Sequence, residues 1–191
     1  MRDRGFSLVE ALVAASIVFA MAAVAFPAFR AHFADAHLVG AGHKFKSQFR
    51  LAYSMAVSSS EYTAIRFERR DDGSVWYAVY RDGNHNGVRA TDIAAGRDIL
   101  ISGPFPLTGG APTVRVAINP GVPAIPPDRG LLSGDPIQFG RSEMLSFSPL
   151  GTATPGTFYL AGDSAQAAVR VTPGSARVRL MLCRGGKWFE R

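Results

Sequence analysis

One apolar stretch near the start of the chain restricts its fold more than any other feature. Residues 6–29 are almost entirely apolar. The four exceptions are Ser7, Glu10, Ser16 and Pro27. A helix rises about 1.5 Å per residue, so a run of this length can cross the roughly 30 Å hydrocarbon core of a bilayer. We therefore expect a transmembrane helix over 6–29, preceded by a short leader, residues 1–5.

Two interpretations of this segment are open from its residues. Arg2 and Arg4 precede the apolar run and should stay in the cytoplasm, which places the rest of the chain on the far side. An ordinary secretory signal peptide would be cut near Ala25 and would release a soluble protein. Against this stands Glu10, because a carboxylate costs about 2.5 to 3.5 kcal/mol at the centre of a bilayer. A retained helix that later pairs with another subunit has a use for such a residue.

The hexapeptide Gly5-Phe6-Ser7-Leu8-Val9-Glu10 resembles the processing signal of type IV prepilins and pseudopilins. The resemblance implies that a prepilin peptidase cuts after Gly5 and methylates the amine of Phe6. It also implies that Glu10 pairs with the N-terminal amine of a neighbouring subunit during assembly, since a buried charge is tolerated mainly beside an opposite charge. Pro27 lies where this family often has a helix-kinking proline. The expected location is the inner membrane, with a periplasmic head.

The helical pattern continues beyond the membrane. Over 30–60, apolar residues recur at three- to five-residue steps with charged residues between them, which predicts an amphipathic helix that packs on the head. Gly40 and Gly42 weaken this helix locally, so a bend is expected there. The helix is expected to end at Ser58-Ser59-Ser60.

The remaining residues, 61–191, read as a β-rich head domain. Alternating or continuous apolar runs predict eight strands, over 63–68, 75–81, 98–102, 114–119, 144–148, 157–161, 167–172 and 177–183. Between Gly103 and Pro136, dense glycine and proline predict mostly loop. One long N-terminal helix packed on antiparallel sheet is an α+β, type IV pilin-like fold.

A second resemblance covers parts of the head. The stretches 49–67 and 147–179 are similar to the GspH/FimT subfamily of minor pseudopilins and minor pilins. The subfamily often carries a Gly-Arg-x-Arg strand, which here has Ala176 in place of the glycine. This resemblance implies a minor pseudopilin of a type II secretion system. The alternative that it implies is a minor type IV pilin at the pilus tip, active in pilus biogenesis or in DNA capture.

The C-terminal strand carries a candidate DNA-binding surface. Arg177 and Arg179 point to the same face of a strand, because side chains alternate with a period of two. Arg170 and Arg184 are expected to extend this stripe, and Trp188 and Phe189 offer a stacking surface. The alternatives are a solvated strand face and a contact with adjacent subunits.

Oxygen-bearing side chains at alternate positions form a candidate cation loop. Asp82, Asn84 and Asn86, followed by Gly87, resemble the first half of a calcium loop. The second half does not fit, because Ile93 stands where the loop requires glutamate. The alternative is a hairpin turn, since Asp-Gly and Asn-Gly favour positive backbone φ angles. Any calcium binding is expected to be weak.

Nothing else in the sequence indicates catalysis or a cofactor. No Ser-His-Asp arrangement, Cys-His pair or phosphate-cradling loop is recognisable, so no enzyme activity and no small-molecule substrate are expected. The single cysteine, Cys183, lies in an apolar strand pattern typical of a core residue. The net charge of +6 permits attraction to anionic partners without selecting among them.

Overall fold

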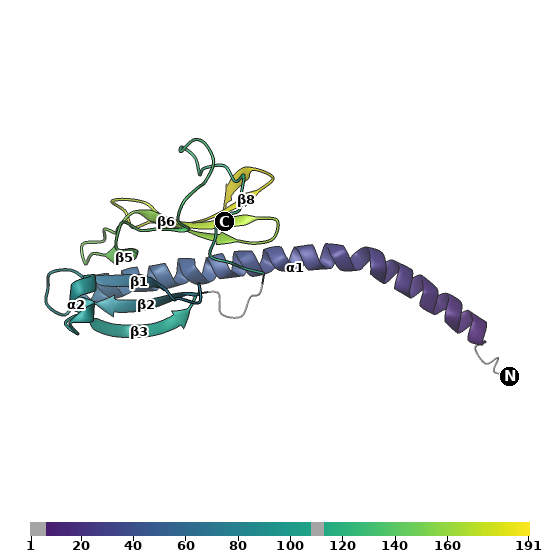
Figure 1. The fold of residues 1–191 in the computed structure, drawn as a ribbon, viewed down its shortest axis with the longest axis horizontal. Helices are drawn as coiled ribbons and strands as arrows, with labels where there is room; N and C mark the ends of the chain where they lie inside the picture. The colour runs from purple at the N-terminus through teal and green to yellow at the C-terminus, as the bar shows by residue number, and fades with distance from the viewer. Residues whose placement is uncertain (1–6, 108–112) are drawn as a thin grey trace.

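A single long helix, α1 (Leu8–Ser59), forms the axis of the molecule, and a β-rich head surrounds its C-terminal half (Figure 1). The computed structural model describes residues 7–107 and 113–191. Within them, one short helix, α2 (Ala90–Ala94), and nine strands follow α1. This arrangement confirms the α+β fold predicted from the sequence. The leader residues 1–5 and Phe6 lie outside the described residues.

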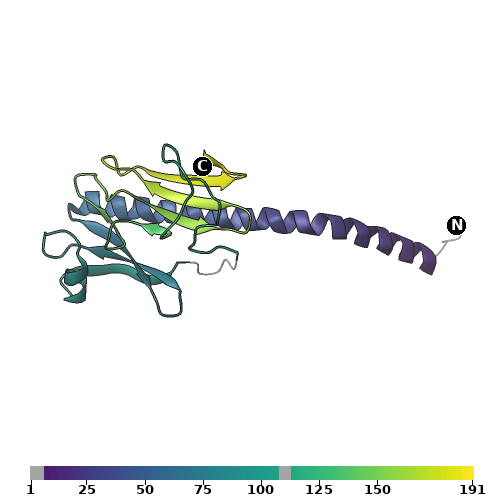
Figure 2. The ribbon, with the colours of Figure 1, turned by 45° about the horizontal axis from the view of Figure 1, so that its top comes forward.

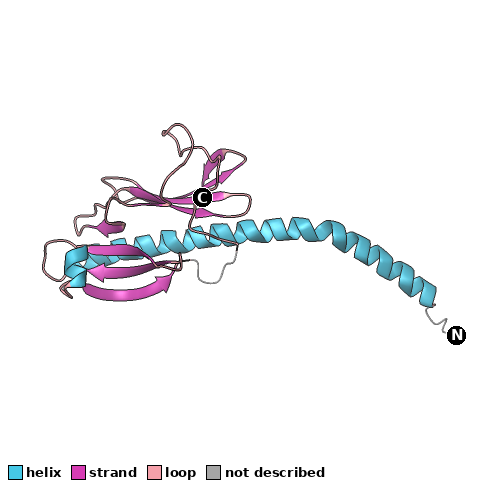
Figure 3. Ribbon diagram, viewed as in Figure 1, coloured by secondary structure: helices cyan, strands magenta, loops and turns pink. Residues whose placement is uncertain are grey.

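The strands form two antiparallel sheets rather than one. The first sheet has the order β3-β2-β1-β5, with bounds Ile99–Pro106, Val75–Arg81, Thr63–Arg69 and Met144–Phe147. The second sheet has the order β4-β6-β7-β8-β9, with bounds Ile137–Gln138, Gly156–Ala161, Gln166–Val171, Val178–Arg184 and Lys187–Glu190. Figures 2 and 3 show the two sheets on different sides of α1. The helix is therefore the shared core element of the head.

The buried face of α1 joins the two sheets. Leu38, Phe45, Phe49, Ala52 and Ala56 are each at most 1% exposed, and they recur at the helical spacing that the sequence predicted. Phe45 packs on Phe158 of the second sheet with ring centroids 5.0 Å apart, and Phe49 packs on Phe67 of the first sheet at 6.4 Å. Each such ring contributes about 1.5 to 3 kcal/mol by leaving water.

The helix runs through Pro27, Gly40 and Gly42 without interruption. Figure 1 shows its curvature in the part that projects from the head. Gly42 instead lies inside the head, where an added Cβ would come within 2.5 Å of the Cδ1 atom of Leu180. The bend expected at the two glycines is wrong: the lack of a side chain at Gly42 allows α1 to approach β8 closely.

Six of the eight predicted strands are confirmed within one residue at each end, and a seventh, 98–102, is confirmed as β3 but extends four residues further, to Pro106, into the stretch expected to be loop. The exception is 114–119, of which only Arg115 pairs with another strand, through an isolated bridge to Ala161. The rest of that segment is held by the buried side chain of Gln166, which accepts the Asn119 N–H and donates to the carbonyls of Ala117 and Leu160. A side chain, and not a backbone ladder, satisfies this part of the loop.

Candidate functional site

The first residues that the structure describes form a capping box, in which Ser7 and Glu10 each accept a hydrogen bond from the backbone of the other. Ser7 is the N-cap of α1, and its hydroxyl accepts the backbone N–H of Glu10 at 3.2 Å. The carboxylate of Glu10 accepts the backbone N–H of Ser7 at 2.9 Å. Sequence reasoning assigned Glu10 but missed Ser7, although the spacing Ser-x-x-Glu before an apolar run is a capping-box signature. The predicted cleavage site, between Gly5 and Phe6, lies outside the described residues.

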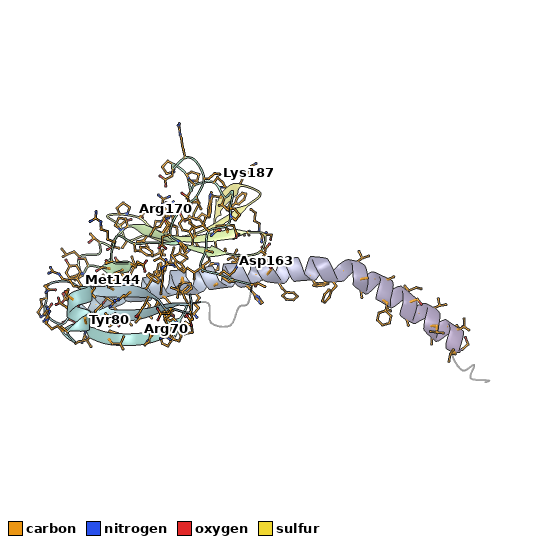
Figure 4. All side chains as sticks on the ribbon, in the orientation of Figure 1. Arg70, Tyr80, Met144, Asp163, Arg170 and Lys187 are labelled. Carbon is orange, nitrogen blue, oxygen red and sulfur yellow. The ribbon has the colours of Figure 1, made fainter. Side chains whose placement is uncertain are left out.

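The helix that follows this cap leaves its apolar side chains uncovered. Leu8–Phe26 has a mean hydropathy of 2.3 and is 0% buried, so by length and composition it could cross a membrane. Large side chains such as Leu8, Phe19 and Val24 are 76 to 81% exposed. Figure 4 shows that side chains stand out around the projecting part of the helix, away from the head. A helix that is apolar on all sides needs lipid or other helices around it.

The arginine stripe on β8 lies on the outer face of the second sheet. Arg179 is directly opposite Arg170 of β7, which Figure 4 labels over this sheet. Glu190 of β9 lies 3.3 Å from Arg177 and 3.7 Å from Arg179, and Asp128 lies 3.2 Å from Arg170. The three arginines therefore face the same side, but two carboxylates neutralise much of their charge.

Two residues expected to extend this surface do not belong to it. Arg184 pairs with Asp35 of α1, because its position in β8 has the opposite parity to Arg177 and Arg179. Trp188 is partly buried in a cluster with Ile125 and Tyr159, and its Nε1–H donates to the carbonyl of Pro123. Its ring is therefore a packing element rather than a free stacking surface. Neither the parity nor this loop contact was recognised from the sequence.

The candidate cation loop forms a closed hydrogen-bond network. Asp82 is 1% exposed, and its carboxylate accepts the N–H groups of Asn84 at 3.1 Å and Gly87 at 2.6 Å. The side-chain amides of Asn84 and Asn86 donate to the carboxylate of Asp92 at 3.3 and 3.1 Å. Among the described residues, no three His, Cys, Asp or Glu side chains are grouped as metal ligands would be. The oxygens of Asp82 are thus already engaged by N–H donors.

Two further buried carboxylates, Asp92 and Asp98, complete this network, and neither was assigned to it from the sequence. Asp98 is 4% exposed and accepts the N–H of Arg89 at 2.9 Å. Asp92 is 3% exposed, and hydrogen bonds from Arg97 and then from Asn86 hold the pKa of its carboxyl below the ordinary value. The loop therefore anchors α2 to the first sheet through charged hydrogen bonds.

Cys183 is not arranged as a nucleophile. It is 4% exposed in β8, and burial raises the pKa of its thiol above the ordinary value. A raised pKa reduces the fraction of reactive thiolate at neutral pH.

Comparison with known proteins gives one match, which lies at the N-terminus. Residues 1–26 match the model described as the prokaryotic N-terminal methylation motif. No curated protein and no solved structure matches the chain. The matched residues include the hexapeptide, the capping box and the uncovered apolar helix. The motif implies processing by a prepilin peptidase and assembly with other pilins. Together with the α+β fold, it indicates a type IV pilin-like or pseudopilin protein.

Proposed function

We propose that this chain is a minor pseudopilin of the GspH/FimT type in a type II secretion system. In this role the peptidase cuts after Gly5 and methylates Phe6. The chain waits in the inner membrane with its head in the periplasm, and it then joins a filament through α1. Its function is structural, in building or priming the filament for protein export.

The observation that carries this proposal is a methylation motif on a helix whose apolar face the chain itself leaves uncovered. Glu10 lies at the start of that helix, with its own N-cap as its present partner. Once Phe6 carries the new terminal amine, Glu10 has a charged partner available on a neighbouring subunit. An opposite charge offsets the cost of the carboxylate in an apolar setting.

The test is a deletion of the chain, scored in parallel for secreted exoproteins, twitching motility and DNA uptake. Loss of secretion alone supports a pseudopilin. Loss of motility or DNA uptake with secretion intact contradicts it and supports a type IV pilus subunit. Complementation with Glu10→Val and with Glu10→Asp separates assembly from folding. We expect the valine variant to accumulate in the membrane without restoring function and the aspartate variant to restore part of it.

A second candidate function is supported by the arginines on the second sheet, namely DNA capture at a pilus tip. Arg177 is 65% exposed at its side chain, and Arg170 and Arg179 lie beside it. Guanidinium groups along one face suit a phosphate backbone, and such binding weakens steeply with salt.

The matching experiment is a mobility-shift assay at low salt. Arg177→Ala with Arg179→Ala is expected to abolish DNA retention. The control variant, Arg69→Ala with Arg81→Ala, removes two ion-paired arginines from the first sheet and is expected to leave DNA retention unchanged. Equal retention by both variants would reject this candidate.

A further inference from the structure

The loop that joins β2 to α2, residues 82–89, contains two dipeptides that form succinimide rings readily in flexible chains. These are Asp82-Gly83 and Asn86-Gly87. Glycine has no side chain to hinder its backbone nitrogen from attacking the side-chain carbonyl carbon of the residue before it. Asn86 is exposed to the water that would open such a ring. Figure 1 shows α2, beside this loop, at the end of the head opposite the projecting helix.

In the folded loop, both attacking nitrogens are engaged by buried carboxylates. The N–H of Gly87 donates to Asp82 at 2.6 Å, and the N–H of Gly83 donates to Asp98 at 3.3 Å. Ring closure requires the nitrogen to lose its proton. A carboxylate in contact with that N–H opposes the loss, because the reaction would place two negative charges side by side. The closed loop therefore suppresses the nucleophile at both dipeptides.

The side chain that would be attacked at the second dipeptide is held as well. The amide nitrogen of Asn86 donates to the Oδ2 atom of Asp92 at 3.1 Å. Asp92 is itself fixed, because its Oδ1 atom accepts the Nε–H of Arg97 at 2.9 Å. This contact sets the orientation of the amide group that the nitrogen of Gly87 would have to reach. Two hydrogen bonds to buried carboxylates therefore have to open before the ring can form.

We propose that Asn86 is a deamidation site, which the carboxylates of Asp82 and Asp92 keep from reacting while the loop is closed. When the loop opens, the nitrogen of Gly87 bonds to the Cγ atom of Asn86, and the bond from Cγ to Nδ2 breaks. The side-chain amide leaves as ammonia with the proton of the Gly87 nitrogen. Water then opens the succinimide to aspartate or isoaspartate, and it is the only other reactant.

The product cannot restore the original hydrogen bonds. A carboxylate at position 86 replaces the amide that donates to Asp92, while Asn84 and Arg97 remain as donors to it. Two carboxylates at hydrogen-bond distance repel each other, so a loop that has reacted closes less tightly than before. Opening of the loop is reversible, but deamidation makes its effect permanent. This modification is independent of the assembly role proposed above.

Mass spectrometry of the full chain tests this site. The wild-type chain is incubated at pH 8 in detergent, once folded and once unfolded in guanidinium chloride, and is then digested at pH 6, where ring closure is slow. Trypsin cuts after Arg81 and Arg89, so a single peptide, 82–89, carries the site. Fragment ions distinguish conversion of Asn86 from conversion of Asn84. Near-ultraviolet circular dichroism shows whether each sample is folded.

We expect Asn86 to convert at least about tenfold more slowly in the folded chain than in the unfolded one, because the folded chain reacts only from its opened loop. Equal rates, or no conversion in the unfolded chain, would overturn the proposal. This comparison needs no variant, so it holds even if a substitution prevents folding.

Two variants assign the protection to the loop carboxylates. Folded Asp82→Ala should convert faster than wild type, because the N–H of Gly87 loses its acceptor. The matched control, Asp135→Ala, removes a carboxylate that pairs with Arg69 elsewhere on the head and should convert at the wild-type rate. A folded Asp82→Ala chain that converts no faster than this control would overturn the role of Asp82.

A last pair of variants tests the consequence of deamidation. Asn86→Asp, which has the side chain of the aspartate product, should lower the thermal unfolding midpoint of the head more than Asn86→Ala does. The alanine variant removes the donor to Asp92 without adding a charge. Equal midpoints for the two variants would overturn the expected repulsion.

Discussion

The two halves of α1 use apolar residues in opposite ways. In the first half, Phe19 and its neighbours are mostly exposed on all sides of the helix. In the second half, Phe45 and Phe49 are 1% and 0% exposed on one face, and the other face carries charged and polar residues together with the partly exposed Leu51 and Val57. One continuous helix therefore carries one apolar surface that the described chain leaves uncovered and another that packs against its own head. The first half is apolar at nearly every position, whereas the buried apolar residues of the second half recur at helical spacing, so the two halves differ in both mean hydropathy and periodicity.

The largest expected change in unfolding free energy comes from removing a phenyl ring in the second half of α1, and the matching removal in the first half is its control. Phe49→Ala is expected to lower the free energy of unfolding of the head by about 3 to 5 kcal/mol, because it opens a cavity between both sheets and the helix. Phe19→Ala, at a residue 76% exposed, should change it by less than about 0.5 kcal/mol. Urea denaturation of both full chains in detergent, followed by near-ultraviolet circular dichroism, measures the difference. Equal destabilisation would contradict the division of the helix.

Two glycines in the second half of α1 test how closely the helix packs against the head. Gly42→Ala places a methyl group against Leu180, which is 1% exposed and cannot move aside freely, so a net loss of about 1 kcal/mol is expected. Gly40→Ala meets no atom within 4 Å and should stabilise the helix by about 0.5 to 1 kcal/mol. The same denaturation assay measures both. Stabilisation by Gly42→Ala would show that α1 and β8 are not closely packed.

A smaller effect, on the pH dependence of the unfolding free energy, is expected from Asp92 in the head. Hydrogen bonds from Arg97 and Asn86 lower the pKa of Asp92 in the folded state, so this stabilisation is present above the unfolded pKa of about 3.9. It is lost as the pH falls through the lower, folded pKa. The difference in unfolding free energy between wild type and Asp92→Asn should therefore shrink from pH 6 to pH 3. A difference that stays constant over this range would contradict the role of the ionised carboxylate.

The smallest expected effect is that of calcium on the head. The carboxylate of Asp82 already accepts two backbone N–H groups, which a cation would have to displace. Calorimetric titration should give an affinity weaker than the roughly micromolar values of calcium sensors. Asp82→Asn serves as the control for nonspecific heat. A sub-micromolar dissociation constant that disappears in this variant would make the loop a cation site.

Periodic features of the chain were predictable, whereas features made by distant contacts were not. The strands β1, β2 and β5 to β8 coincide with alternating or continuous apolar runs, and α1 ends within the serine run 58–60. β9 was missed because Lys187–Glu190 is short and mostly exposed, although Gly185-Gly186, both at positive φ, is a two-residue hairpin signal. The five-residue α2 is too short to show a helical period.

In the candidate sites as well, residues with a local sequence signal were predictable, and pairings made by distant contacts were not. Glu10 is recognisable because a carboxylate inside an apolar run is costly, and the capping partner Ser7 could have been read from its spacing. The pairing of Arg177 and Arg179 with Glu190, and of Arg184 with Asp35, depends on the register of β8 and β9 and on the packing of α1. Sequence spacing cannot supply that register.

The continuity of α1 has a mechanical consequence. The helix extends unbroken from Leu8 to Ser59, a length of about 78 Å, and its second half is clamped between two sheets. A pull on the head is therefore carried along a stiff rod to the start of the anchor, with little lost to stretching of a linker. Whatever force withdraws the head from the membrane surface withdraws Glu10 by nearly the same distance.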